Sequence, residues 1–171
     1  MKGGNVLDNL LISPSFISNI SSKIAVDQIL KINERSLLFG IYLTPIDALE
    51  LLETRSQALR DFGRIEIGSA TIAKIIEMFC DSSYIFQANY SETIHELLET
   101  FYYIKNESLD LISDDELIEI MKDYYEHRCH GSIELLQHRE LERLARNLRY
   151  GLPHDSNMED DNVVEEEYDE E

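Results

Sequence analysis

The sequence predicts a mainly α fold: a compact bundle of about six helices with a small two-stranded β-ribbon and a disordered acidic C-terminal tail. Three observations support this prediction. Apolar residues recur at spacings of three and four along most of the chain, which is the period of an amphipathic helix. Capping residues precede several of these stretches. Hydrophobic residues make up 43% of the 171 residues, which is enough to form a buried core.

The chain divides into three parts on this basis. We expect a flexible N-terminal arm over residues 1–17, a single helical domain over residues 18–153, and a disordered tail over residues 154–171. One domain fits the length, since domains typically hold roughly 100 to 200 residues. The tail has few apolar groups and dense like charge, so ordering it would cost more free energy than it returns.

Two helices are predicted in the first half of the domain. The first spans about residues 18–34, where apolar residues recur at short helical spacings. The second begins at Thr44, which is a good N-cap residue, and Pro45 suits the first helical position. Asp47 stands where the acid of a capping box is expected. This helix ends near Gly63.

Two short segments between the helices are predicted to form the ribbon. Residues 37–43 are rich in strand formers and too short for a helix. Residues 64–67 read Arg-Ile-Glu-Ile and alternate polar with apolar side chains, which is typical of a strand. We therefore expect these two segments to pair.

Four further helices follow, each with one apolar face. Asn89 with Glu92, Ser113 with Glu116, and Ser132 supply cap signatures. The apolar positions expected to form the core are Ile72, Ile75, Ile76, Phe79, Cys80, Ile94, Leu97, Leu98, Phe101, Tyr102, Leu117, Ile120, Met121 and Tyr124. No single helix of this kind is stable alone, so their apolar faces must pack together.

The charge balance and the cysteines exclude several classes of protein. The net charge is -19, from 34 acids and 15 bases, and ten of the acids lie in the last 17 residues. The remaining body holds 24 acids against 15 bases, a net of -9, so its field opposes nucleic-acid binding. Two distant cysteines do not make a disulfide framework. No signal peptide and no run of 18 apolar residues are found, so we expect a cytoplasmic protein without a membrane span.

The densest chemical cluster is His127-Arg128-Cys129-His130. Imidazole and thiolate are zinc ligands, so His127, Cys129 and His130 are candidates for a metal site. A closed site needs four ligands, and polar residues at a helix end are also expected as partners of its free carbonyls. His95 belongs to one Glu-x-x-His unit, but a di-iron bundle needs two. No cofactor motif occurs, and we expect no cofactor.

The last predicted helix carries the most informative surface. At 100° per residue, its leucines fall on one side and Arg139, Arg143 and Arg146 on the other, with Arg149 nearby. An ordinary solvated face explains this pattern, because arginines suit the C-terminal half of a helix. The functional alternative is a docking surface for an acidic protein partner. We add the hypothesis that the chain's own acidic tail covers this face, against the alternative of a merely solubilising tail.

Three stretches carry a resemblance to a known family. They are LTPIDALELLETRSQAL at residues 43–59, SETIHELLETFYYIKNESLDLISDDELIEIMKDYYEHRCHGSIELL at residues 91–136 and RELERLARNLR at residues 139–149. Over about residues 25–150 the chain resembles an uncharacterised family of small cytosolic proteins of unknown function from Firmicutes, chiefly clostridia. The resemblance implies a bacterial cytosolic protein and transfers no catalytic residue.

The sequence therefore favours a non-enzymatic intracellular protein that acts through protein–protein interaction or regulation. The alternative is a metal-dependent protein or enzyme that uses the cluster from His127 to His130. The adjacent tyrosines Tyr102-Tyr103 and Tyr124-Tyr125 are candidates for a half-exposed interface, because neighbours on a helix cannot both point directly inward. Packing at the edge of the core is the alternative for these rings.

Overall fold

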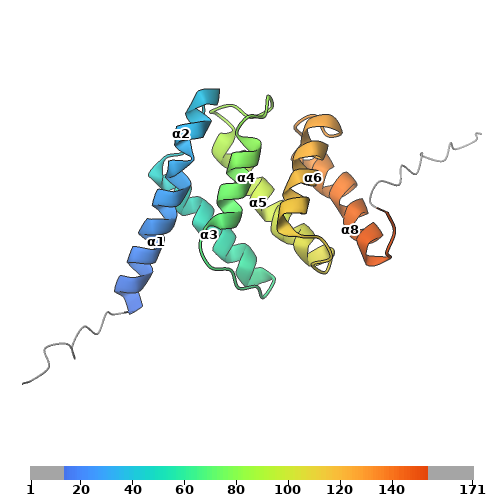
Figure 1. The fold of residues 1–171 in the computed structure, drawn as a ribbon, viewed down its shortest axis with the longest axis horizontal. Helices are drawn as coiled ribbons and strands as arrows, with labels where there is room; N and C mark the ends of the chain where they lie inside the picture. Colours follow the sequence, from blue (N-terminus) through green and yellow to red (C-terminus); the bar gives the residue numbers. More distant parts are fainter. Residues whose placement is uncertain (1–13, 154–171) are drawn as a thin grey trace, which may run out of the picture.

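The structure, a computed structural model, describes residues 14–153 (Figure 1). The regular elements within this range are all helical. In chain order they are α1 (Pro14–Lys31), α2 (Asn33–Ser36), the 3₁₀ helix η1 (Leu37–Phe39), α3 (Pro45–Asp61), α4 (Ala70–Phe79), α5 (Tyr90–Glu107), α6 (Asp114–His127), α7 (Ile133–Leu135), the π-helix η2 (Leu136–Leu141) and α8 (Glu142–Arg149). Residues 1–13 of the predicted arm and the predicted tail lie outside the described range, whereas residues 14–17 form the start of α1.

Helix α5 is the centre of the bundle. It packs against α3, α4, α6, α7, η2 and α8, and α4 and α6 also pack against each other. Helix α1 lies at one end of the molecule against α3 and α4, and α8 lies at the opposite end (Figure 1). No helix in residues 14–153 is long and apolar enough to cross a membrane.

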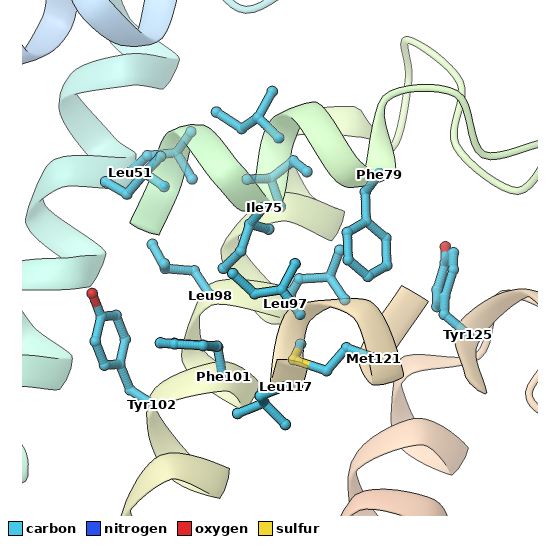
Figure 2. Packing of buried hydrophobic residues seen from close by; sticks show 14 of the residues in the cluster. Leu51, Ile75, Phe79, Leu97, Leu98, Phe101, Tyr102, Leu117, Met121 and Tyr125 are labelled. Carbon is cyan, nitrogen blue, oxygen red and sulfur yellow. The ribbon is translucent and has the colours of Figure 1, made fainter. Parts of the chain in front are cut away.

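The core is built from the predicted apolar faces of α4, α5 and α6 (Figure 2). The predicted core positions on α4 and α5 are all buried, and so are Leu117, Met121 and Tyr124 on α6. Ile120 is half-buried at the edge of the same cluster. Helix α1 differs: Ile29 is buried, but Ile20 and Ile24 are exposed. The helical spacing of apolar residues thus predicted most of the core. It did not predict that Ile20 and Ile24 on α1 are exposed.

The predicted helix starts at Thr44, Ser113 and Ser132 are confirmed. Thr44 Oγ1 accepts a hydrogen bond from the backbone N–H of Asp47, whose carboxylate accepts one from the Thr44 N–H, so the capping box is complete. Ser113 and Ser132 each accept one backbone N–H at the start of their helices. Asn89 stands at the N-cap of α5 without capping it, because its side chain bonds the backbone of the preceding turn instead.

The predicted β-ribbon is wrong, because amide side chains satisfy the backbone that the strand was to pair. Residues 37–39 form η1, which Gly40 ends with a φ of 77°. Asn33 bonds both the N–H and the carbonyl of Leu43. Gln87 does the same for Tyr42. Residues 40–43 therefore have partners without a neighbouring strand.

Residues 64–67, the second predicted strand, are not part of a sheet in the described structure. Their side chains do alternate as a strand requires: Arg64 and Glu66 are half-buried, whereas Ile65 and Ile67 are exposed. Arg64 forms an ion pair with Asp110 at 2.6 Å, which fixes one end of the segment on the connection between α5 and α6. The alternation that the sequence showed is thus present in the burial of these side chains, but the predicted strand is wrong.

Candidate functional site

An open groove of about 650 Å³ lies between α1, α3 and the connection from α3 to α4. Helices α1 and α3 form its walls, and residues 66–68 form one edge. The residues that line the groove are Ser21, Ser22, Ile24, Ala25, Gln28, Leu52, Arg55, Ser56, Glu66, Ile67 and Gly68.

Arg55 is a buried cation on the α3 wall of this groove. Only 9% of the residue is exposed. Its Nη2 donates a hydrogen bond of 2.8 Å to the backbone carbonyl of Glu66. Its Nε is buried and has no hydrogen-bond partner, and no ion pair of Arg55 is found within residues 14–153. A buried charge without a counterion is costly, so Arg55 is the kind of residue with which an acidic group would pair.

The nearby carboxylate of Glu66 is already committed to other partners. It accepts hydrogen bonds from the hydroxyl of Tyr102 and, at 2.5 Å, from Thr71 Oγ1. Figure 2 shows the Tyr102 ring at the edge of the core, with its hydroxyl toward α3. Burial, and then the hydrogen bond to Glu66, raise the pKa of Tyr102 above its ordinary value, so this hydroxyl stays a donor. Glu66 thus holds its segment in place and leaves Arg55 without a carboxylate.

The rim of the groove is apolar. Ile65 and Ile67 are 95% and 93% exposed, which is close to full exposure for side chains that favour burial. Ile24 on the opposite wall is 53% exposed, and Ile20 lies one helical turn before it on α1. Neighbouring exposed aliphatic side chains around a polar centre mark an interaction surface in a protein of this size.

Helix α1 supplies the polar side chains of the other wall. Ser21 and Ser22 are exposed hydroxyls. Gln28 accepts a hydrogen bond of 2.7 Å from Ser69 Oγ through its side-chain oxygen, which leaves its amide NH₂ as a donor. The groove therefore combines one uncompensated guanidinium with further donors, a set that suits an anionic group.

The predicted arginine face is rearranged by the π-helix η2. A π turn holds more residues than an α turn, so positions placed at 100° per residue shift across it. Glu140 becomes buried, with 4% of the residue exposed, and both neighbouring arginines turn to it. Arg139 Nε and Arg143 Nη2 each lie 2.8 Å from a Glu140 carboxylate oxygen, and Arg128 Nη1 lies at 3.3 Å. Two of the arginines that were predicted to face outward, Arg139 and Arg143, therefore belong to an ion cluster around the buried Glu140.

The remaining two arginines lie at the C-terminal end of α8. Arg149 is exposed and contacts Glu107 at 3.3 Å. Arg146 is exposed, and its side chain makes no hydrogen bond or ion pair with any described residue. The acidic tail, which was expected to cover this face, lies outside the described range.

The candidate metal ligands do not converge. His127 is exposed and bonds Asp123 one turn before it. Cys129 is buried, and burial raises the pKa of its thiol, so it is a poor nucleophile. His130 has a φ of 48°, and its Nδ1 lies 3.4 Å from the Tyr84 hydroxyl. Across residues 14–153, no group of three or more His, Cys, Asp or Glu side chains could hold a metal ion.

His95 contacts a hydroxyl group, and among residues 14–153 it is not part of a group of side chains that could bind a metal ion. Its Nδ1 lies 2.7 Å from Thr54 Oγ1, across the interface between α3 and α5. A hydroxyl beside an imidazole is half of a nucleophile–base arrangement. Both residues lie inside helices, however, where the backbone N–H groups bond within the helix and cannot form an oxyanion hole. The pair therefore acts as a polar contact between the two helices.

The paired tyrosines are packed into the core. Tyr124 and Tyr125 are both at least 96% buried, so they do not form a half-exposed interface. The Tyr125 ring packs edge-on against Phe79 and Tyr84, with centroids 5.5 Å and 6.0 Å away. The Arg128 guanidinium covers the Tyr124 ring at 3.9 Å. Tyr102 is buried as well, and Tyr103 alone is half-buried.

Arg55 was not among the predicted site residues, although the sequence contains a signal for it. The buried face of α3 consists of Ala48, Leu51, Arg55, Ala58 and Leu59. Arg55 stands four residues after one of these apolar positions and three before another, so it occupies a position on the apolar stripe. An arginine on such a stripe is the kind of buried cation that marks a site.

Comparison with known proteins gives a family and no activity. A family model described as "Family of unknown function (DUF6323)" matches residues 28–154, about three quarters of the chain. No curated protein and no solved structure matches the chain.

Proposed function

The chain belongs to the family of unknown function DUF6323, and because this membership brings no activity with it, we propose a function from the groove itself. The protein acts as a non-enzymatic binding protein that receives an acidic group of another protein between α1 and α3. Arg55 holds this group, and the exposed isoleucines of the rim contact the apolar residues around it.

The buried, unpartnered Nε of Arg55 is the observation that carries the proposal. Because only 9% of Arg55 is exposed, a charge-assisted hydrogen bond to it is stronger than one at the surface. Of the described residues that line the groove, only Glu66 is acidic, and its carboxylate is bound to Tyr102 and Thr71. An incoming carboxylate would therefore meet hydrogen-bond donors. The Glu66 carboxylate is occupied by its own two donors.

The charge of the whole chain affects how such a partner arrives. With a net charge of -19, the summed field repels an acidic partner at a distance. Recognition must then come from short-range contacts, namely the Arg55 guanidinium and the apolar rim. The pair formed at Arg55 would be largely buried, so added salt would screen it less than a surface pair.

A cytoplasmic location is part of the proposal. Cys80 and Cys129 are free thiols, both buried. Burial raises the pKa of each thiol, which keeps them protonated and unreactive. Free thiols of this kind suit a reducing compartment.

The end of α8 is a second surface that the same kind of partner would contact. The Arg146 side chain is exposed and has no partner among residues 14–153, and within the same range the Arg149 side chain pairs only with Glu107, at 3.3 Å. Arg139 and Arg143 already form ion pairs with Glu140, so they are less available to bind an acidic partner. We therefore rank this surface below the groove.

Titration with N-acetyl-L-aspartate, a small probe with two carboxylates, tests the proposal. We expect a saturable shift of the backbone amide signals of Ser21, Gln28 and Arg55 in a nuclear magnetic resonance experiment. Arg55→Met should weaken this binding by about tenfold or more, because Met fills the same space without donating hydrogen bonds.

Arg60→Met is the matched control, since Arg60 lies on the same helix but has 58% of its side chain exposed and pairs with Glu53. It should leave binding of the probe unchanged. Circular dichroism of both variants confirms that they fold. Equal binding by the wild type and Arg55→Met would refute the assignment of the site.

A further inference from the structure

Helix α1 connects the N-terminal segment of the chain, residues 1–13, to the groove. The helix begins at Pro14. The residues of α1 that line the groove begin at Ser21, about two helical turns later, and continue to Gln28. The N-terminal segment is therefore attached to the helix that forms one wall of the groove, and its length and composition can be compared with what the groove requires.

The segment is long enough to reach the level of Arg55. Ala25 lies on the α1 wall eleven residues after Pro14, about 17 Å along the helix at 1.5 Å per residue. Asp8 stands six residues before Pro14, and an extended chain covers about 20 Å over that length at roughly 3.3 Å per residue. A proline disfavours the helical conformation in the residue before it, so a change of direction is expected here. A chain that turns back at this point brings Asp8 level with Ala25, which lines the groove together with Arg55.

The composition of the segment matches the groove. Asp8 is the only acid of residues 1–13, and apolar residues flank it on both sides in the stretch VLDNLL, residues 6–11. The groove is lined by one cation, Arg55, and by the aliphatic side chains of Ile24 and Ile67, each more than half exposed. A single carboxylate between aliphatic side chains therefore meets a single guanidinium and apolar surface that it can cover.

The acidic C-terminal tail matches the groove less well. It follows α8, which lies at the opposite end of the molecule from α1 (Figure 1). Ten of the last 17 residues are acidic and none is Lys or Arg, whereas the groove offers one guanidinium. Entry of one of these acids would bring the others close to a body that is itself acidic, which is unfavourable.

From this match we infer that residues 6–11 fold back into the groove, that Asp8 pairs with Arg55, and that the segment thereby competes with the acidic partner. This inference rests on the proposed function and names how the same site is regulated. Because the segment is tethered to α1, its effective concentration at the groove is on the order of millimolar. The apparent affinity for a partner falls in proportion to the fraction of chains whose groove is free.

Titration of the full chain with N-acetyl-L-aspartate, followed by nuclear magnetic resonance, measures the competition. Asp8→Asn removes the charge and keeps the size of the side chain, so the affinity for the probe should rise by about fivefold or more. The matched control is Asp27→Asn, which changes the net charge equally at an exposed position of α1 that does not line the groove. It should leave the affinity unchanged. An equal rise for both variants would show a general effect of charge and overturn the inference.

A spin label on the variant Asn9→Cys locates the segment directly. Both native cysteines are buried, so the label reacts at the introduced thiol. We expect the label to broaden the backbone amide signals of Leu52 and Arg55 on α3. This broadening should weaken when Asp8→Asn is added to the labelled chain, because the segment then lacks its partner in the groove. Broadening that is the same with and without Asp8→Asn would contradict docking through this carboxylate.

The remaining outcomes separate the inference from the proposed function. Probe binding that requires Arg55 but is equally strong in the wild type and in Asp8→Asn would overturn the competition and leave the proposed function intact. A probe that binds neither chain would remove the proposed function, and the inference with it. Broadening that occurs only between a spin-labelled chain and a second, isotope-labelled chain would assign the segment to the groove of a second copy.

Discussion

Replacing Leu97 by Ala is expected to lower the free energy of unfolding by about 3 to 5 kcal/mol. Leu97 lies on α5 and is completely buried in the middle of the core (Figure 2). Its loss removes apolar burial and leaves a cavity between α5 and the helices on either side, and a close-packed core relaxes only partly into such a space. Urea denaturation followed by circular dichroism measures the change.

The same substitution at Leu38 is the control. Leu38 is 80% exposed on η1, so Leu38→Ala should change the free energy of unfolding by less than about 0.5 kcal/mol. A loss below about 1 kcal/mol for Leu97→Ala would show that α5 is not the central helix of the bundle.

Glu140→Gln is expected to cost about 2 kcal/mol of stability at neutral pH, because it removes the charge on which three arginines converge. Breaking a fully buried ion pair usually costs about 3 to 5 kcal/mol. The cost here is smaller, since Arg128, Arg139 and Arg143 keep 32%, 54% and 39% of their side chains exposed and can return to water. Glu134→Gln, at an exposed position nearby, should have almost no effect.

The contribution of Glu140 should also depend on pH. Burial alone would raise the pKa of its carboxyl, but the hydrogen bonds from Arg139 and Arg128 and the charge of Arg143 outweigh burial and lower it below 4.5. The stabilisation is therefore complete above pH 4.5, the unfolded value, and is lost as the pH falls through the lower value in the folded chain. Wild type and Glu140→Gln should converge in stability in acid. A difference that stays constant down to the acid limit would contradict this explanation.

Local features of the fold could be predicted from the sequence, because the residues that determine them are neighbours in the chain. The capping box at Thr44 and the buried face of α5 are of this kind. The β-ribbon could not be judged locally, since the backbone of residues 42 and 43 bonds the side chains of Gln87 and Asn33, which lie 45 and 10 residues away.

The candidate site was harder to predict for the same reason. Placing the arginines of the last helix at constant angles assumed a regular α-helix, and η2 breaks that regularity and buries Glu140. Arg55 looked like one more charged residue on an amphipathic helix. Its significance depends on contacts with Glu66, eleven residues later, and on the distant hydroxyl of Tyr102.

The side-chain Nε–H signal of Arg55 gives the most direct test of the central claim. This claim is that the buried Arg55 guanidinium binds an acidic group of another protein. The measurement is a nuclear magnetic resonance spectrum of the arginine side chains during titration with N-acetyl-L-aspartate. We expect the Arg55 signal to shift and to exchange more slowly with water at lower probe concentrations than any shift of the Arg146 and Arg149 signals at the weaker surface. An unchanged Arg55 signal, with shifts at Arg146 and Arg149 instead, would contradict the claim and place acid binding at the end of α8.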